Sequence, residues 1–133
     1  MKNRVKIKQL EDLIVYRKAE EVARDVFLLS SFGPLYKQYI LRDQLKRSAL
    51  SVVSNIAEGY GRFSPNEFRH YLSIANGSAF EMRAQVNLAG KLGYLDEMEV
   101  NRLVTCCIDI SKMLRGLKRS IESNIGIKPE SKS

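Results

Sequence analysis

The residues best suited to metal chemistry are Glu67 and His70, which form a Glu-x-x-His pattern. On a bundle helix this spacing places a carboxylate and an imidazole on one face, as in carboxylate-bridged di-iron proteins. Such sites need two of these patterns and two further carboxylates, but His70 is the only histidine in the chain. Glu67 also follows Ser64 by three residues, where it is expected to complete a capping box. We therefore predict no metal site.

Two further patterns that could support chemistry also have structural interpretations. Cys106 and Cys107 are adjacent, and neighbouring helical residues point in different directions, so we expect two reduced core thiols without a disulfide or a zinc site. Gly59 and Gly61 follow a helical segment rather than a strand, so they do not form a phosphate-cradling loop. No nucleophile is paired with a base in the sequence. We predict no enzyme and no cofactor.

The net charge of +7 is placed unevenly along the 133 residues. The first eight residues carry four cations and no acid, whereas residues 9–126 are nearly balanced. A balanced body with a basic arm is not the charge pattern of a dedicated DNA-reading domain. The arm could contact phosphate or serve solubility alone, and both interpretations stay open.

The N-terminus and the apolar runs indicate where the protein resides. No apolar stretch follows the charged start MKNRVKIKQL, so no signal peptide is expected. No apolar run approaches the roughly 18 residues that a membrane span needs. We expect a cytoplasmic protein that does not associate with membranes.

Four segments have the apolar periodicity of amphipathic helices. Their expected bounds are about 12–30, 36–58, 64–92 and 96–123. Short connections make sequence neighbours antiparallel, so the sequence predicts an all-α, up-down-up-down four-helix bundle. The expected division is a basic N-terminal arm over residues 1–10, the bundle over 11–123 and a disordered C-terminal tail over 124–133.

Capping and breaking residues support these bounds. Asp12 is the expected N-cap of the first helix, Ser64 with Glu67 forms a capping box, and Asp96 begins the fourth helix with the same pattern. Gly77 interrupts the third segment at a cost of about 1 kcal/mol relative to alanine. It indicates either close approach by another helix or a tolerated defect. Cations favoured by the helix dipole occupy the final turns at Lys112, Arg115, Lys118 and Arg119.

Polar side chains interrupt the apolar faces of the second and third helices. We predict that they form a network, in which any buried carboxylate needs an arginine or several hydrogen bonds. The predicted members are Asn55, Glu58, Ser78, Glu81 and Arg83. Such a network can set helix register within one subunit or contribute to a subunit interface, and the sequence leaves both interpretations open.

Two blocks of the sequence carry a family resemblance. The stretch 44–62 contains Asn55-Ile56-Ala57-Glu58-Gly59, and a second block contains Gly77-Ser78 with Glu81 three residues later. These blocks resemble the bacterial four-helix-bundle proteins encoded by intervening sequences of 23S ribosomal RNA genes. The resemblance covers about residues 10–120.

The resemblance implies a homopentamer of bundles arranged as a ring, without established catalytic activity. The chain also resembles a related accessory protein of diversity-generating retroelements, which is a basic pentameric bundle that binds a reverse transcriptase and nucleic acid. The nearly balanced body of this chain departs from that strongly basic character.

These observations predict a non-enzymatic oligomer that binds RNA or DNA weakly and without sequence preference. Phosphate contacts of this kind make binding sensitive to salt. The predicted contacts are Lys2, Arg4, Lys6 and Lys8 in the arm, with Lys46, Arg47, Arg62 and Arg69 around the turn between the second and third helices. The alternative is a protein-protein interaction scaffold with no nucleic-acid role.

Overall fold

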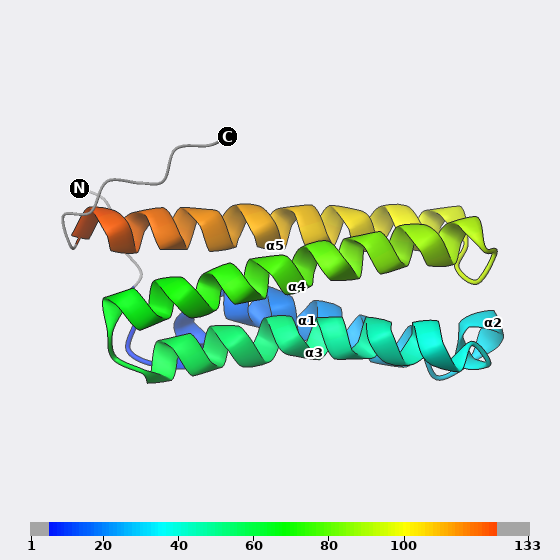
Figure 1. The fold of residues 1–133 in the computed structure, drawn as a ribbon, viewed down its shortest axis with the longest axis horizontal. Coiled ribbons are helices and arrows are strands. Elements are labelled where there is room, and N and C mark those ends of the chain that lie inside the picture. Colours follow the sequence, from blue (N-terminus) through cyan, green and yellow to red (C-terminus); the bar gives the residue numbers. More distant parts are fainter. Residues whose placement is uncertain (1–5, 125–133) are drawn as a thin grey trace.

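The computed structural model describes residues 6–124 and is helical through most of that range. The four long helices run alternately up and down around one core (Figure 1), so the predicted all-α four-helix bundle is confirmed. Asn124, which we expected in the tail, is the last residue of the final helix. In chain order the elements are the 3₁₀ helix η1 (Leu10–Asp12), α1 (Ile14–Leu29), α2 (Gly33–Tyr36), α3 (Tyr39–Gly61), α4 (Pro65–Lys91) and α5 (Glu97–Asn124).

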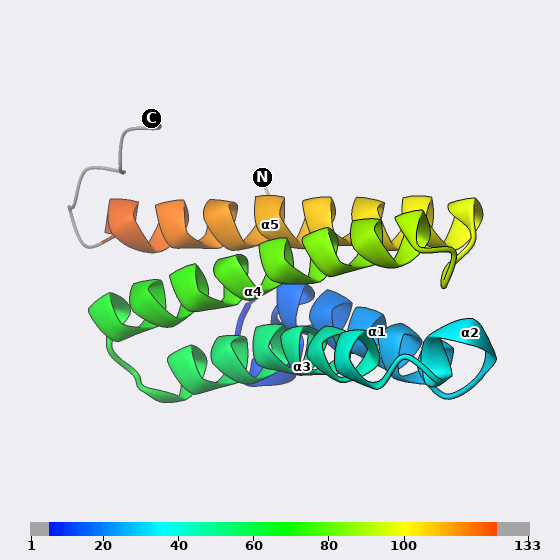
Figure 2. The same ribbon diagram turned by 45° about the vertical axis from the view of Figure 1, so that its right-hand side comes forward.

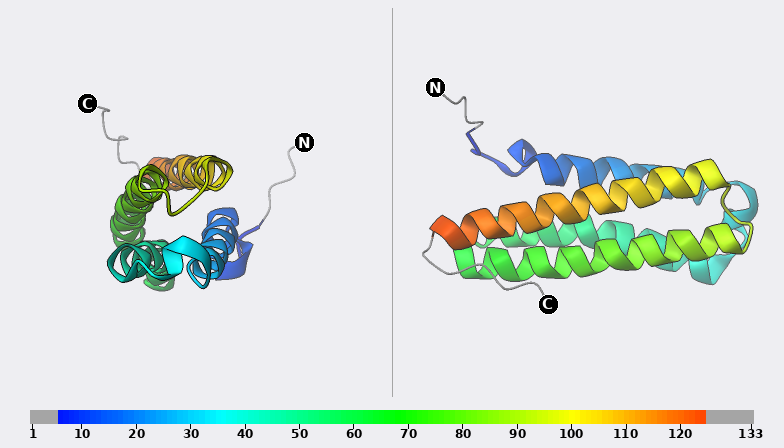
Figure 3. Two further views of the ribbon diagram at one scale, coloured as in Figure 1. Left: turned by 90° about the vertical axis from the view of Figure 1, so that its right-hand side faces the viewer. Right: turned by 90° about the horizontal axis from the view of Figure 1, so that it is seen from above.

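The four long helices differ in length and in how closely they pack. α3 and α4 form the most extensive pair, α5 packs along α4, and α1 packs more on α3 than on α5 (Figure 3). The 16 residues of α1 span about 24 Å, against about 42 Å for the 28 residues of α5. The α4 and α5 ribbons draw apart from their connecting turn toward the far end of α5 (Figure 2).

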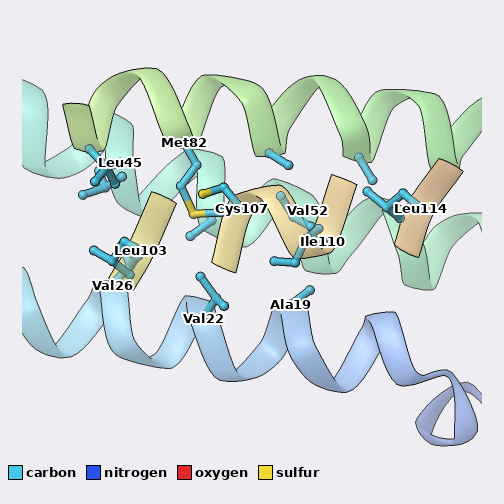
Figure 4. Packing of buried hydrophobic residues seen from close by; sticks show 14 of the residues in the cluster. Ala19, Val22, Val26, Leu45, Val52, Met82, Leu103, Cys107, Ile110 and Leu114 are labelled. Carbon is cyan, nitrogen blue, oxygen red and sulfur yellow. The ribbon is translucent and has the colours of Figure 1, made fainter. Parts of the chain in front are cut away.

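One apolar stripe from each long helix meets in the core. Figure 4 shows Val22 and Val26 of α1 opposite Leu103 and Ile110 of α5, and all four are almost fully buried. Phe27 is an apolar residue of α1, but it is 38 % exposed. Its ring instead lies 4.9 Å from the ammonium of Lys46 on α3.

The start of α1 differs from the prediction. Asp12 is not its N-cap, because the chain first forms η1 and Leu13 occupies the cap position. The Asp12 carboxylate accepts hydrogen bonds from the backbone amides of Lys8 and Gln9, at 2.9 and 3.2 Å. It therefore satisfies the free amides of the 3₁₀ turn, and α1 begins without a side-chain cap.

The two predicted capping boxes have different outcomes. Asp96 and Glu99 exchange both hydrogen bonds, at 2.8 and 3.1 Å, and confirm the box that begins α5. The Ser64 hydroxyl accepts a hydrogen bond from the backbone amide of Glu67 at 3.4 Å. The Glu67 carboxylate does not return this bond and instead accepts one from the guanidinium of Arg62 at 3.4 Å. Ser64 is thus the N-cap of α4 as expected, while Glu67 ties the helix start to the preceding turn.

Close helix contacts occur at glycines other than Gly77. A β-carbon at Gly77 would meet no neighbouring group within 4 Å, which excludes the close approach considered for this residue. A β-carbon at Gly59 would lie 2.7 Å from Cβ of Tyr71, and one at Gly90 would lie 2.6 Å from Cγ2 of Val100. These two glycines allow α3 to approach α4 and α4 to approach α5.

Candidate nucleic-acid interface

A network of neutral polar side chains crosses the interface between α3 and α4. The Ser51 and Ser78 hydroxyl oxygens are 2.7 Å apart, and the Asn55 amide donates to the hydroxyl and carbonyl oxygens of Ser51. One turn away, the Ser48 hydroxyl donates to the side-chain oxygen of Gln85 at 2.8 Å. These bonds connect specific turns of the two helices and hold their register within one protomer.

The other predicted members of the network lie outside it. Glu58 is half exposed and pairs with Arg62 at 2.8 Å, and Glu81 is exposed. Arg83 is half-buried on the side of α4 near Cys107. The prediction also missed Gln85. A neutral network avoids the desolvation cost of buried carboxylates, which accounts for the exposure of both glutamates.

Cys107 is not poised for nucleophilic chemistry. Burial, reinforced by the neighbouring Cys106 and opposed by Arg83, raises the pKa of Cys107 to about 12. Because the thiolate is the nucleophile, a thiol that stays protonated at neutral pH is inert. His70 packs edge-on against Tyr71, and within residues 6–124 no three His, Cys, Asp or Glu side chains gather to hold a metal ion.

The predicted phosphate contacts do not form one surface. Lys6 and Lys8 are exposed beside η1, while Lys2 and Arg4 lie outside the described residues. Lys46 and Arg47 lie in the first half of α3, about 20 Å along the helix from the α3–α4 turn that we expected them to flank. Arg47 is exposed, and Lys46 is held over the Phe27 ring.

Arg62 is occupied by neighbouring groups. Its guanidinium donates to Glu58 at 2.8 Å, to Glu67 at 3.4 Å and to the Tyr71 hydroxyl at 3.0 Å. It also lies 5.3 Å from the centre of the Tyr71 ring. With two carboxylates beside it, Arg62 contributes little free positive charge and instead stabilises the α3–α4 turn.

Arg69 forms the most buried ion pair of the described chain. Its Nε and one terminal nitrogen donate to a single oxygen of Glu122, at 3.2 and 3.0 Å. The Glu122 side chain is 4 % exposed and that of Arg69 is 20 % exposed. The pair bridges α4 and α5 at the end where the two helices diverge (Figure 2). Its Coulomb attraction must offset the desolvation of both charges.

A cationic surface emerges along the second half of α5. Helix residues that are three, four or seven positions apart share one face. Four cations in this part of α5 have this spacing, and we call them the α5 basic face: Lys112, Arg115, Lys118 and Arg119. The only acid between residues 110 and 124 is Glu122, which is buried against Arg69. Lys112, Arg115 and Arg119 are exposed to solvent, whereas Lys118 is half-buried.

A match to a family model over most of the sequence shows which protein family this chain belongs to. Residues 11–116 match the model described as 23S rRNA-intervening sequence protein. The chain belongs to this family. The chain is also similar to a solved structure of a protein with unknown function from the S23 ribosomal protein family of Bacteroides thetaiotaomicron. The TM-score is 0.74 at 24 % identity, covering 80 % of this chain and 99 % of that one, which shows a shared fold. The search of curated proteins gives no match.

In this 23S rRNA-intervening sequence protein, the block Asn55-Ile56-Ala57-Glu58-Gly59 has structural roles. Asn55 joins the polar network, Ile56 is fully buried and Gly59 allows the close approach of α4. Glu58 pairs with Arg62 at the end of α3. The block therefore specifies the packing of α3 on α4. Among residues 6–124, no helix is both long and apolar enough to cross a bilayer.

Proposed function

We propose that this protein is a non-enzymatic RNA- or DNA-binding bundle that contacts phosphates without reading base sequence. The α5 basic face is the observation that carries this proposal. Lys112, Arg115 and Arg119 are exposed on successive turns, and Glu122, the next acid along the helix, is buried against Arg69, so these three cations form a surface suited to a polyanion. Each phosphate neutralised by such a side chain releases condensed counterions, so affinity depends on salt rather than on sequence.

The test compares two variants of the full chain that each lose three positive charges. Lys112→Gln/Arg115→Gln/Arg119→Gln removes the exposed members of the α5 basic face, and Lys37→Gln/Lys46→Gln/Arg47→Gln is the matched control at the other side of the molecule. Binding to an RNA hairpin and a DNA duplex is measured by fluorescence anisotropy across a salt series. We expect the first variant to bind at least tenfold more weakly, with the salt slope reduced by about 2–3.

Two outcomes would contradict the proposal. Equal losses in both variants would show a general charge effect without a dedicated face. No binding by the unchanged protein near physiological salt would favour the interaction-scaffold alternative instead.

A specific observation supports self-association as a second property. A groove of about 500 Å³ runs between the start of α3 and the end of α4, and its apolar lining comes from Tyr39, Ile40, Leu41, Leu88, Leu92 and Tyr94. Ile40 is 84 % exposed and Tyr39 is 65 % exposed. Apolar surface of this kind on a soluble protein commonly marks an interaction site. We propose that a second copy covers it, in the pentamer that the family resemblance implies.

Light scattering tests this assembly. We expect the mass of the unchanged protein to be about five times the 15.2 kDa of one chain. Ile40→Asp places a charge in the groove and should shift the protein to monomer, because the buried carboxylate would lack a partner. Met98→Asp, at an exposed position of α5 outside the groove, is the control. A monomeric unchanged protein, or a stable Ile40→Asp oligomer, would contradict this interface.

A further inference from the structure

We propose that exposed aromatic rings at the junction of α1, α2 and α3 bind an unpaired nucleic-acid strand by stacking against its bases. The short helix α2 connects α1 to α3 at this end of the bundle (Figure 1). Three rings and two cations meet there, and we call them the aromatic corner: Phe27, Tyr36, Tyr39, Arg42 and Lys46. The inference rests on the proposed function for the class of ligand, but it concerns another surface, and bases rather than phosphates.

Rings and cations alternate along one face of α3. The Arg42 guanidinium lies 4.9 Å from the centre of the Tyr39 ring and 5.5 Å from that of the Tyr36 ring. The Lys46 ammonium lies 4.9 Å from the centre of the Phe27 ring, so this face of α3 is turned toward α1. Tyr39, Arg42 and Lys46 are three and four residues apart and share that face. The aromatic corner therefore extends over about 10 Å of α3.

The rings of the aromatic corner remain accessible although cations lie over them. Tyr39 is 65 % exposed, Tyr36 is 49 % exposed and Phe27 is 38 % exposed. Arg42 is held in place, because it donates to the Asp43 carboxylate and to the carbonyl oxygen of Tyr36, both at 2.9 Å. Rings that are already positioned by a fixed guanidinium lose little freedom when a base stacks on them. The corner is thus prepared for a flat ligand.

The surroundings of the aromatic corner are positively charged. Asp43 is the only acid among residues 26–57, against four cations: Lys37, Arg42, Lys46 and Arg47. Asp43 offsets the charge of Arg42, to which it is hydrogen-bonded, whereas Lys37 and Arg47 are exposed to solvent. The preceding acid, Asp25, is held by Arg102 of α5 at 2.8 Å. The charge of this region therefore favours a polyanion.

The combination of exposed rings and cations favours an unpaired strand over a duplex. Cations attract the phosphate backbone of a single strand, and its bases stack on aromatic rings. In a duplex the bases are stacked on one another and present their edges in the grooves. Every base has a π face, so stacking of this kind requires no particular base sequence. The aromatic corner would thus bind unpaired segments without reading them.

Fluorescence anisotropy with two single-stranded DNA probes tests the aromatic corner in the full-length protein. One probe is a strand of twelve thymine nucleotides, and the other has the same length, label and phosphate backbone but no bases. The phosphate contacts are the same for both probes, so stacking on the bases distinguishes them. We expect the unchanged protein to bind the thymine strand about tenfold more tightly than the abasic strand.

Phe27→Leu/Tyr36→Leu removes two rings of the aromatic corner and keeps every charge. Both side chains lie outside the lining of the groove that we assign to a second copy. This variant should bind the thymine and abasic strands with similar affinity. Phe63→Leu/Phe80→Leu is the matched control, because it removes two exposed rings elsewhere and should keep the preference for thymine. Urea unfolding midpoints establish that both variants are folded.

Two results would overturn the aromatic corner. Equal affinity of the unchanged protein for the thymine and abasic strands would show that no bases are contacted, and this result depends on no variant. An equal loss of the preference in both double variants would show that the rings of the corner have no particular role.

A DNA duplex separates this inference from the proposed function. The charge control of that function includes Lys46 of the aromatic corner, so a ligand without unpaired bases is needed to distinguish the two surfaces. The triple glutamine variant of the α5 basic face should lose duplex affinity, and Phe27→Leu/Tyr36→Leu should keep it. A protein that binds the duplex but shows no preference for thymine over the abasic strand retains the proposed function and loses the aromatic corner. The preference for thymine without duplex binding would give the opposite result.

Discussion

Replacing Glu122 with glutamine is expected to lower the free energy of unfolding by about 3 kcal/mol, the lower end of the range for breaking a buried ion pair. The Glu122 carboxylate is 4 % exposed and accepts two charge-assisted hydrogen bonds from Arg69. Without its charge, a guanidinium that is four-fifths buried has no counter-charge. The loss stays near the lower end because the exposed fifth of the Arg69 side chain allows it to turn toward water.

Urea unfolding near pH 7 measures this effect. Glu58→Gln is the matched control, because the Glu58 carboxylate is 50 % exposed and pairs with Arg62, four residues later in the chain. Surface pairs contribute about 1 kcal/mol or less. Arg69→Met/Glu122→Leu should recover most of the lost stability, since an apolar pair of similar volume avoids desolvation of both charges. Equal losses in Glu122→Gln and Glu58→Gln would show that the buried pair adds nothing particular to the fold.

Replacing Gly59 with alanine is expected to lower the free energy of unfolding by about 2 kcal/mol, although alanine is the better helix former. The new β-carbon would lie 2.7 Å from Cβ of Tyr71 and 3.0 Å from Cδ1 of Phe68. A β-carbon cannot rotate away from its backbone, and neither can the Cβ of Tyr71. The contact can be relieved only by moving α3 away from α4, which loosens core packing along both helices.

Gly77→Ala makes the same chemical change in the middle of α4 and serves as the control. Its β-carbon would meet open space, so only the helix-propensity gain of up to about 1 kcal/mol remains. We therefore expect urea unfolding midpoints to move in opposite directions for the two variants. A rise in both midpoints would show that the helices separate at Gly59 without cost, and would contradict the close packing of α3 on α4.

Much of the fold could be predicted because its signals lie within a few residues of each other. Apolar residues at helical spacing predicted one buried face for each helix, and Val22, Val26, Leu103 and Ile110, which follow this spacing, are almost fully buried. The capping box that begins α5 is equally local, since Asp96 and its partner are three residues apart. Asp12 was wrong as the N-cap of α1, because Asp12 ends η1 and the cap position lies one residue later, at Leu13.

The candidate sites could not be predicted in the same way, because their contacts join distant parts of the chain. Arg69 and Glu122 are 53 residues apart, and no spacing rule relates them. Gly59 and Gly77 are both glycines inside helices, and only the position of the neighbouring helix distinguishes the packed one from the open one. Ser48 and Gln85 likewise meet only because of the register between α3 and α4.

The sequence by itself determined four amphipathic helices, their up-and-down order and an excess of cations, since periodicity, breaking residues and charge are properties of the chain. The tertiary structure decided which cations remain available to a ligand. Arg62 and Arg69, both predicted as phosphate contacts, are neutralised by carboxylates, whereas Lys112, Arg115 and Arg119 of the α5 basic face, attributed at first to the helix dipole, are exposed to solvent. The reason is physical: Coulomb attraction depends on distance in space, and helix packing sets the distances between residues that the sequence separates.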